Sequence, residues 1–426
     1  MSANSFKLQT LPNGLQVMLV PREATEAVTV EYFFRAGSRY ETPDINGLAH
    51  FTEHMVFKGS EHFPTFSDVN HAINSVGGNF NAYTGGEVMG FYVKLGAEKV
   101  EIALDVLSSI LTTPKLDKDE LDRERGVILE EINMYEDTPG DQIHMLLDKI
   151  AYPDHPIGWP TLGSKENIRS FKRGQFGEYM AKYLTPDRAV LAISGNVSRV
   201  TEKLLQKYNG RFSGSSDVAP VPAPDSFAPR KVAVRKRETE QTHIGMAMYA
   251  PTYADDIGSA QLSVLTMLLG GNSSSRLFTE VREKQGLAYY VYSIPEQLVD
   301  TGTLSIYAGV TNEKAGQALS SILRELKRVR DGDFTGKELD VAKESYKGTR
   351  ALRWEDSTAL GGLYADQQLL LGRVMTPKQI FEMIDAVTRE DVGKLAADIV
   401  QDAKLSVAMI GPQDEDKIRK LATVDG

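Results

Sequence analysis

The sequence of 426 residues contains no cysteine, which excludes disulfide bonds, thiol nucleophiles and cysteine-ligated metal sites. Any metal site must therefore be built from histidine and carboxylate side chains. Histidine is scarce as well, with seven residues in the whole chain. A close grouping of histidines in this sequence is therefore informative.

The chain also lacks long apolar runs and an excess of positive charge. The longest apolar run near the N-terminus, residues 17–20, is far too short to cross a bilayer. The formal net charge is −10 and no stretch is dense in lysine or arginine, which argues against a general nucleic-acid binder. The first residues show no basic segment followed by an apolar one. We therefore expect a cytoplasmic protein without membrane insertion; a leader removed earlier would instead indicate the periplasm.

The length and composition predict a globular protein with two domains. A composition of 41% hydrophobic and 25% charged residues is ordinary for a globular protein. A chain of 426 residues is longer than a single hydrophobic core usually supports. Residues 213–230, near the middle, are rich in proline and serine, as linkers are. We predict an N-terminal domain over residues 1–212 and a C-terminal domain over residues 231–426.

The two halves share local sequence patterns. Residues 116–122 resemble residues 334–340, which lie 218 positions later, and residues 191–195 resemble residues 407–411, which lie 216 positions later. Two matches at nearly one spacing indicate an internal duplication. We therefore expect an α+β protein of two homologous α/β-sandwich domains, each a mostly antiparallel sheet with helices on one face.

Local patterns predict the first elements of the N-terminal half. Asn13-Gly14 between two alternating segments, residues 6–11 and 15–20, is typical of a hairpin. Apolar alternation and helical periodicity then predict strands over residues 27–34, 79–84 and 88–95, and helices over residues 47–57, 97–111 and 118–135.

His50, Glu53 and His54 form a His-x-x-Glu-His motif within the helix predicted over residues 47–57. Positions i, i+3 and i+4 of a helix share one face, so the two imidazoles and the carboxylate converge. Two histidines at this spacing are common ligands of Zn²⁺. The order of the motif is the reverse of the commoner His-Glu-x-x-His, and this inverted order is typical of a separate group of zinc peptidases. Two solvated histidines are the alternative, which fits poorly beside apolar residues such as Phe51.

A catalytic zinc needs a third protein ligand, and the helix predicted over residues 118–135 offers candidates. Glu124 and Glu131 are two helical turns apart and lie on the same face, whereas Glu130 points elsewhere. Acidic residues on a helix are usually a solvated surface. The residues alone therefore leave the third ligand open.

The motif and the later glutamate together resemble the pitrilysin, or insulinase, family of zinc peptidases. His54 is followed after 76 intervening residues by Glu131, and the resemblance covers essentially the whole chain. It is closest to two-domain bacterial members similar to the mitochondrial processing peptidase. It implies one Zn²⁺ per chain held by His50, His54 and Glu131, with Glu53 as the general base. Glu124 would be a carboxylate that orients a ligand histidine.

Two further segments resemble functional parts of that family. The first resembles an edge strand that binds substrate peptides through its backbone, formed by Asn79, Phe80, Asn81, Ala82, Tyr83 and Thr84. An ordinary core strand is the alternative there. The second resembles an Arg-Tyr element, in which Arg282 and Tyr289 would donate hydrogen bonds to the substrate carbonyl and the developing oxyanion. The residues alone favour a surface arginine and a strand tyrosine, and Arg276 and Tyr290 are the nearest other choices.

The resemblance implies a zinc metalloendopeptidase that hydrolyses extended peptides or small unfolded proteins in a chamber closed by two chains. The C-terminal half has a single histidine, His243, and no second zinc motif. It would supply its Arg-Tyr element to the zinc site of a partner chain. We expect a homodimer because one chain has both elements, with a heterodimer of paralogous subunits as the alternative. A non-catalytic or dedicated processing subunit is the alternative function, and the sequence identifies neither the substrate nor the cleavage preference.

Overall fold

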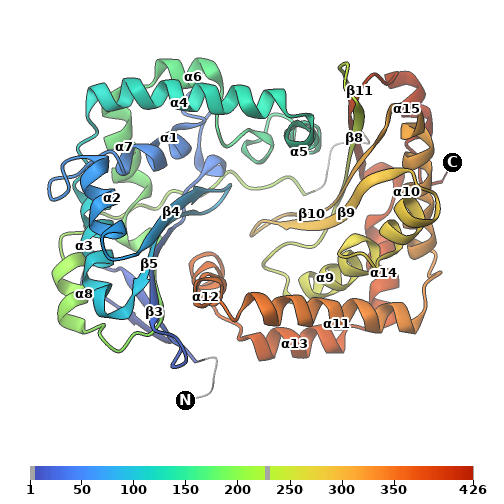
Figure 1. Cartoon of the computed structure of the whole chain (residues 1–426). Coiled ribbons are helices and arrows are strands. Elements are labelled where there is room, and N and C mark those ends of the chain that lie inside the picture. The colour runs from blue at the N-terminus through green and yellow to red at the C-terminus, as the bar shows by residue number, and fades with distance from the viewer. Residues whose placement is uncertain (1–4, 226–230, 426) are drawn as a thin grey trace. The chain divides into compact units, whose positions relative to one another are not determined.

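Figure 1 shows the computed structural model, which describes residues 5–225 and 231–425. The chain forms two compact units. The first comprises Met1–Ile132, Trp159–Val221 and Leu352–Pro377; the second comprises Asn133–Gly158, Pro222–Ala351 and Lys378–Gly426. Each unit therefore contains a segment from the other half of the chain. The domain boundaries expected at residues 212 and 231 stay a prediction.

The first unit is built on a six-stranded sheet with the order β1-β2-β6-β3-β5-β4. β2 and β6 are parallel and the other neighbouring strands are antiparallel. The strands are β1 Lys7–Thr10, β2 Gln16–Pro21, β3 Ala27–Phe34, β4 Asn79–Thr84, β5 Met89–Gly96 and β6 Ala189–Gly195. The helices are α1 Leu48–Val56, α2 Phe66–Asn74, α3 Val100–Thr112, α6 Lys165–Ser170, α7 Arg173–Tyr183, α8 Glu202–Asn209 and α12 Ser357–Leu371, with short 3₁₀ turns at Ser38–Tyr40, Ala97–Lys99 and Pro186–Arg188.

The second unit is built on a five-stranded sheet with the order β7-β11-β8-β10-β9. Its strands are β7 Lys231–Lys236, β8 Gln241–Tyr249, β9 Ala288–Gln297, β10 Gly302–Thr311 and β11 Leu405–Gly411. Its helices are α5 Pro139–Ala151, α9 Asp256–Gly270, the π-helix η5 Phe278–Lys284, α10 Ala315–Arg330, α14 Arg389–Ile399 and α15 Glu415–Leu421, with 3₁₀ turns at Pro156–Gly158, Asn312–Lys314 and Asp402–Lys404. The unit boundaries fall within α4 Lys118–Asp137, within α11 Gly336–Arg353 and at the start of α13 Pro377–Ala386.

The two sheets share one topology. The order β2-β6-β3-β5-β4 in the first sheet corresponds strand for strand to β7-β11-β8-β10-β9 in the second. In each sheet the first of these pairs is parallel and the others are antiparallel. The matched residues 191–195 and 407–411 lie in the equivalent strands β6 and β11. The fold is therefore the duplicated, mostly antiparallel α+β arrangement predicted from the sequence.

The structure confirms the elements predicted in the N-terminal half. β1 and β2 form the antiparallel hairpin around Asn13-Gly14, and strands β3 and β4 have the predicted bounds. The motif helix is α1, and the helix predicted over residues 97–111 begins as a 3₁₀ turn before α3. Residues 213–225, the described part of the predicted linker, contain no helix or strand.

One face of each sheet carries the main hydrophobic core, and the opposite face packs against a helix from the other half of the chain. Val28, Val30 and Tyr32 of β3 point into the first core. Thr29, between them, instead shares a hydrogen bond of 2.8 Å with Thr358 of α12. Figure 1 shows α12 in orange near β3 in blue. In the second unit α5 likewise packs on β8 and β11, opposite the face that contacts α9 and α10.

The contact of α12 with the first sheet buries two carboxyl groups. Glu31 lies on β3 and Asp366 on α12. Burial raises the pKa of Glu31 to about 8 and the charge of Asp366 raises it as well, whereas a hydrogen bond from Tyr83 opposes the rise. Burial raises the pKa of Asp366 to about 7, although Arg353 opposes that rise. Both groups therefore stay protonated to a higher pH in the folded chain than in the unfolded chain.

We expect the free energy of unfolding to fall as the pH rises from about 5 to 8.5. The pKa values of Glu31 and Asp366 lie above their ordinary values, so these two groups bind more protons in the folded chain than in the unfolded chain across this window. Urea denaturation at several pH values measures the fall. Glu31→Gln should reduce the fall in the free energy of unfolding over this pH range by on the order of 1 kcal/mol. The exposed control Glu23→Gln should not, and equal slopes for the parent and Glu31→Gln would contradict the assignment.

Among the described residues, no helix combines the length and the apolar character that a membrane span requires.

Candidate active site

The helix that carries the motif is capped by a residue outside it. α1 begins after Gly47, whose φ of 98° is in the left-handed region and which has no side chain to cap the helix. The buried carboxylate of Glu41 accepts hydrogen bonds from the backbone N–H groups of Gly47 and Ala49, at 2.9 and 2.7 Å. Asn46 donates to the same carboxylate at 3.0 Å. Glu41 thereby satisfies free N–H groups of the first turn, immediately before His50.

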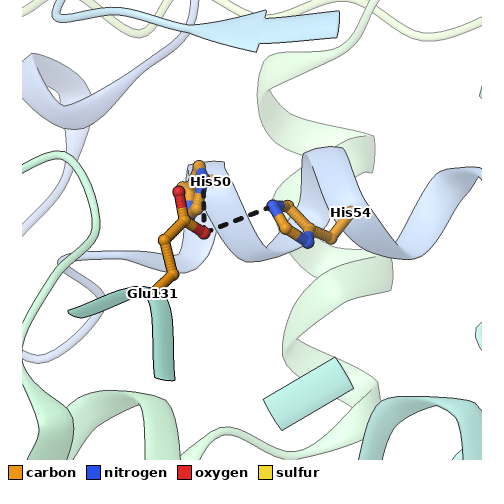
Figure 2. A group of neighbouring side chains, drawn as sticks. All are labelled: His50, His54 and Glu131. Carbon is orange, nitrogen blue, oxygen red and sulfur yellow. Dashed lines mark ion pairs between the residues drawn. The ribbon is translucent and has the colours of Figure 1, made fainter. Parts of the chain in front are cut away.

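Three of the predicted site residues converge at one point. One potential ligand atom each from His50, His54 and Glu131 lies within 4.8 Å of the other two. Figure 2 shows the Glu131 carboxylate facing both imidazoles, and its Oε2 atom lies 3.8 Å from Nε2 of His50 and 3.8 Å from Nε2 of His54. The centroids of the His50 and His54 imidazole rings are 4.7 Å apart. α1 supplies both histidines and α4 supplies the glutamate.

The three donors fit a zinc ion. Zinc–nitrogen and zinc–oxygen bonds of about 2.0–2.2 Å in a tetrahedron hold ligand atoms roughly 3.3–3.5 Å apart. The two separations of 3.8 Å from Glu131 therefore need only a small contraction, and none of the three separations exceeds 4.8 Å. Burial, and then the neighbouring His54, lowers the pKa of His50 to about 4, which keeps its imidazole neutral as a ligand must be. Two imidazoles and one carboxylate form the donor set of many catalytic zinc sites.

Glu124 supports one of the histidines, as the resemblance implies. Its Oε1 lies 2.9 Å from Nδ1 of His54, and its Oε2 lies 2.6 Å from Nζ of Lys58. Burial raises the pKa of Glu124, but the hydrogen bonds from His54 and Lys58 outweigh this effect and leave the pKa below its ordinary value. An ionised acceptor on Nδ1 fixes the ring so that Nε2 points to Glu131. Within the described part of the chain, Nδ1 of His50 is buried and has no such partner.

Glu53 lies beside this group and carries one hydrogen bond. Its Oε2 accepts from the hydroxyl of Thr84 at 2.5 Å. Burial raises the pKa of Glu53, while Thr84 and then His54 lower it, and the net shift is upward. A carboxylate with a raised pKa is a better proton acceptor near neutral pH. Glu130, the neighbour of Glu131, is exposed, as predicted from its place on the helix.

The strand predicted to bind substrate is an edge strand. Among the described residues, β4 pairs with β5 alone, so its other edge offers unpaired backbone groups. Asn79, Asn81 and Tyr83 are exposed, and the residues between them are half-buried. This geometry is compatible with peptide binding, whereas an interior strand of the sheet would not be.

Arg282 and Tyr289 lie in the second unit, each at an irregularity of the backbone. Arg282 is an exposed residue of the π-helix η5, and its guanidinium lies 4.6 Å from the ring centre of Phe278. Tyr289 is the extra residue of a β-bulge, because Val310 pairs with Ala288 whereas the preceding residue of β10 pairs with Tyr290. Its side chain is 57% exposed. π-helical turns and bulges are both enriched at functional sites, where they redirect side chains.

The neighbouring choices in that element have structural contacts instead. Arg276 is buried and forms ion pairs with Glu325 and Glu338, at 3.1 and 2.7 Å. The hydroxyl of Tyr290 lies 2.8 Å from Nδ1 of His243. Both contacts occupy polar groups within the second unit, which leaves Arg282 and Tyr289 as the exposed pair.

Family models match most of the chain. The model described as insulinase (peptidase family M16) matches residues 16–165, and the model described as the peptidase M16 inactive domain matches residues 170–346. The chain belongs to the M16 peptidase family. This M16 chain carries its single His-x-x-Glu-His motif within the first matched region, and the second region, which lacks the motif, is the one named inactive.

Relatives of this M16 protein include bacterial proteins that are named as zinc proteases. It is 35% identical over 410 residues to the Bacillus subtilis protein named uncharacterized zinc protease YmxG, across 96% of this chain and 98% of that protein. A Streptomyces coelicolor protein, also named as a zinc protease, is 32% identical over 422 residues, which cover 97% of this chain and 91% of the relative. A protease from Helicobacter pylori has the same fold, with a TM-score of 0.89 at 23% identity, over 96% of this chain and 100% of that chain.

Sequence reasoning did not single out three residues that hold this site. They are the Glu41 cap, the Lys58 partner of Glu124 and the Thr84 hydroxyl on Glu53. Lys58 lies four positions after His54, in the turn that follows α1, so its spacing from His54 gave a usable signal. The other two contacts join separate elements and had no spacing that would reveal them.

Proposed function

We propose that this M16 protein is a zinc metalloendopeptidase that hydrolyses extended peptides or small unfolded proteins. The observation that carries the proposal is the convergence of His50, His54 and Glu131 beside the carboxylate Glu53. The names of its relatives as zinc proteases support it. The intact donor set argues against a non-catalytic subunit.

In this proposal His50, His54 and Glu131 hold one zinc ion. When bound, the ion polarises the substrate carbonyl and lowers the pKa of a water molecule. Glu53 takes a proton from the attacking water and returns it to the amine that leaves when the peptide bond breaks. Glu124 keeps the His54 ring in its ligating orientation.

We propose that the free edge of β4, residues Asn79–Thr84, binds the substrate. An extended peptide can add to an exposed strand edge through main-chain hydrogen bonds, which read backbone shape rather than side-chain identity. Such binding suits unfolded chains of varied sequence. The exposed Asn81 and Tyr83 side chains would then contact substrate side chains.

We also propose that Arg282 and Tyr289 donate hydrogen bonds to the substrate carbonyl in a homodimer, with each chain serving the zinc site of its partner. Their exposure at a π-helix and a β-bulge supports this role. Donors aimed at the developing oxyanion are a large contribution to amide hydrolysis. A heterodimer with a paralogous chain is the alternative assembly.

Product mapping tests the proposed function. The purified chain is incubated with a mixture of unstructured peptides, and the products are identified by mass spectrometry. We expect internal cleavage that stops when a chelator removes the metal and resumes when zinc is restored. In the proposed reaction the zinc ion held by His50, His54 and Glu131 is what lowers the pKa of the attacking water. About one zinc per chain should be bound after purification. Cleavage that is indifferent to the chelator, or no cleavage by the zinc-loaded chain, would overturn the proposal.

A further inference from the structure

Thr84, the last residue of β4, donates its hydroxyl hydrogen to Oε2 of Glu53 at 2.5 Å. We propose that this hydrogen bond positions the Glu53 carboxylate for proton transfer, so that the edge strand also sets the geometry of the base. Thr84 is then a positioning residue that acts through Glu53. The inference rests on the proposed function and adds a side-chain role to a residue whose backbone belongs to the proposed substrate strand.

The alternation of β4 brings this hydroxyl to Glu53. Phe80, Ala82 and Thr84 are half-buried, whereas the residues between them are exposed. The ring of Phe80 lies 5.4 Å from the ring of Phe57, which directly follows α1. This face of β4 therefore lies against the zinc-motif helix, and the opposite face points away from it.

The segment after Thr84 is held by the backbone. Gly85 and Gly86 use their carbonyl groups to accept hydrogen bonds from the N–H groups of Ser38 and Arg39, at 3.2 and 3.0 Å. These bonds fix the end of β4, and with it the Cα atom from which the Thr84 hydroxyl projects. A group can position its neighbour only if it is itself held, and Thr84 meets that condition.

The hydrogen bond gives the two carboxylate oxygens of Glu53 different roles. An ionised carboxylate only accepts hydrogen bonds, and the threonine hydroxyl has one hydrogen to donate. Oε2 accepts from Thr84, while Oε1 has no hydrogen bond among the described residues and is the oxygen that takes the proton. A charge-assisted hydrogen bond of this length holds the carboxylate against rotation. Without it, the distance and angle for proton transfer are no longer fixed.

The test compares Thr84→Val, which keeps the branched shape and removes the hydroxyl, with Thr84→Ser, which keeps the hydroxyl. Zinc-loaded protein is assayed on a quenched fluorescent peptide. Thr84→Val should lower kcat by about 10- to 100-fold with KM and zinc content within about twofold of the parent. Thr84→Ser should recover kcat to within about threefold. Thr10→Val, the same change on the opposite edge strand of the sheet, is the matched control.

The split between kcat and KM separates this role from a contact with substrate. If Thr84 served only as part of the peptide-binding strand, Thr84→Val would raise KM and leave kcat unchanged. That result overturns the inference, as does a Thr84→Ser variant that is as impaired as Thr84→Val. Cleavage by the parent that depends on Glu53 but not on Thr84 overturns this inference and leaves the proposed function standing.

A crystal structure of Thr84→Val tests the positioning without any assay of activity. The Glu53 carboxylate should move from its parental place or occupy more than one rotamer, whereas Thr84→Ser should keep a single one. An unchanged, single Glu53 rotamer in Thr84→Val would overturn the inference. If the parent cleaves no peptide, the proposed function fails, and the two crystal structures still decide whether Thr84 holds Glu53.

Discussion

Replacing Glu53 with glutamine is expected to lower kcat on a peptide substrate by about 10²- to 10⁴-fold. The amide has nearly the shape of the carboxylate, and its oxygen can still accept the hydrogen bond from Thr84. It cannot take a proton from water, so the loss should be in the chemical step. KM and the zinc content should change little, because Glu53 lies beside His50, His54 and Glu131 rather than among them.

The matched control for this prediction is Glu130→Gln. Glu130 is an exposed carboxylate next to Glu131 on α4, and the structure gives it no part in the site. Its replacement should leave kcat within about twofold of the parent, because isolated surface substitutions have small effects. A Glu53→Gln variant that cleaves at the parental rate with zinc bound would show that another group acts as the base.

Replacing Arg39 with methionine is expected to destabilise the first unit by about 3–5 kcal/mol. Arg39 and Glu87 form an ion pair in which the two side chains are 0% and 4% exposed. Removing the arginine takes this cation away from a carboxylate whose side chain is 4% exposed, and breaking a buried ion pair by removing one partner is costly. Guanidinium denaturation monitored by circular dichroism measures the loss, which should appear as a lower transition midpoint.

Two further variants sharpen the test of the ion pair. Arg199→Met breaks a pair with Glu98 whose side chains are 61% and 73% exposed, and it should cost less than about 1 kcal/mol. The double variant Arg39→Met with Glu87→Leu removes both buried charges and should recover most of the stability. A single Arg39→Met variant as stable as Arg199→Met would contradict the prediction.

Local patterns in this sequence predicted the elements that local forces determine. The Asn13-Gly14 turn, the alternation of β3 and β4 and the periodicity of α1 and α4 appear in the structure with bounds within about two residues. The exchange of α5 and α12 between the units could not be predicted in this way. An amphipathic helix shows which of its faces is buried, but not which of two similar sheets covers that face.

The convergence of the three proposed zinc donors was predictable because their chemistry and their spacing are both restrictive. His50 and His54 share a helical face by sequence distance alone, and the family resemblance then implied Glu131 rather than a solvated surface. Thr84 and Glu41 carry no comparable signal, because a strand threonine and an acidic residue ahead of a helix are ordinary features. Their roles depend on tertiary contacts to Glu53 and to the start of α1. The same holds for the bulge at Tyr289, which depends on its register with β10.

Because α12 packs in the first unit and α5 in the second, the order in which the chain is synthesised decides when each unit can be completed. The proposed zinc donors and the motif helix all emerge from the ribosome within the first 132 residues, and the last strand of their sheet is β6. The sheet face that carries Glu31 packs against α12, residues Ser357–Leu371. A nascent chain must therefore carry an unfinished first unit while the whole second sheet except β11 is made. Domains usually fold one after another from the N-terminus, whereas this chain ties completion of its first unit to its last hundred residues.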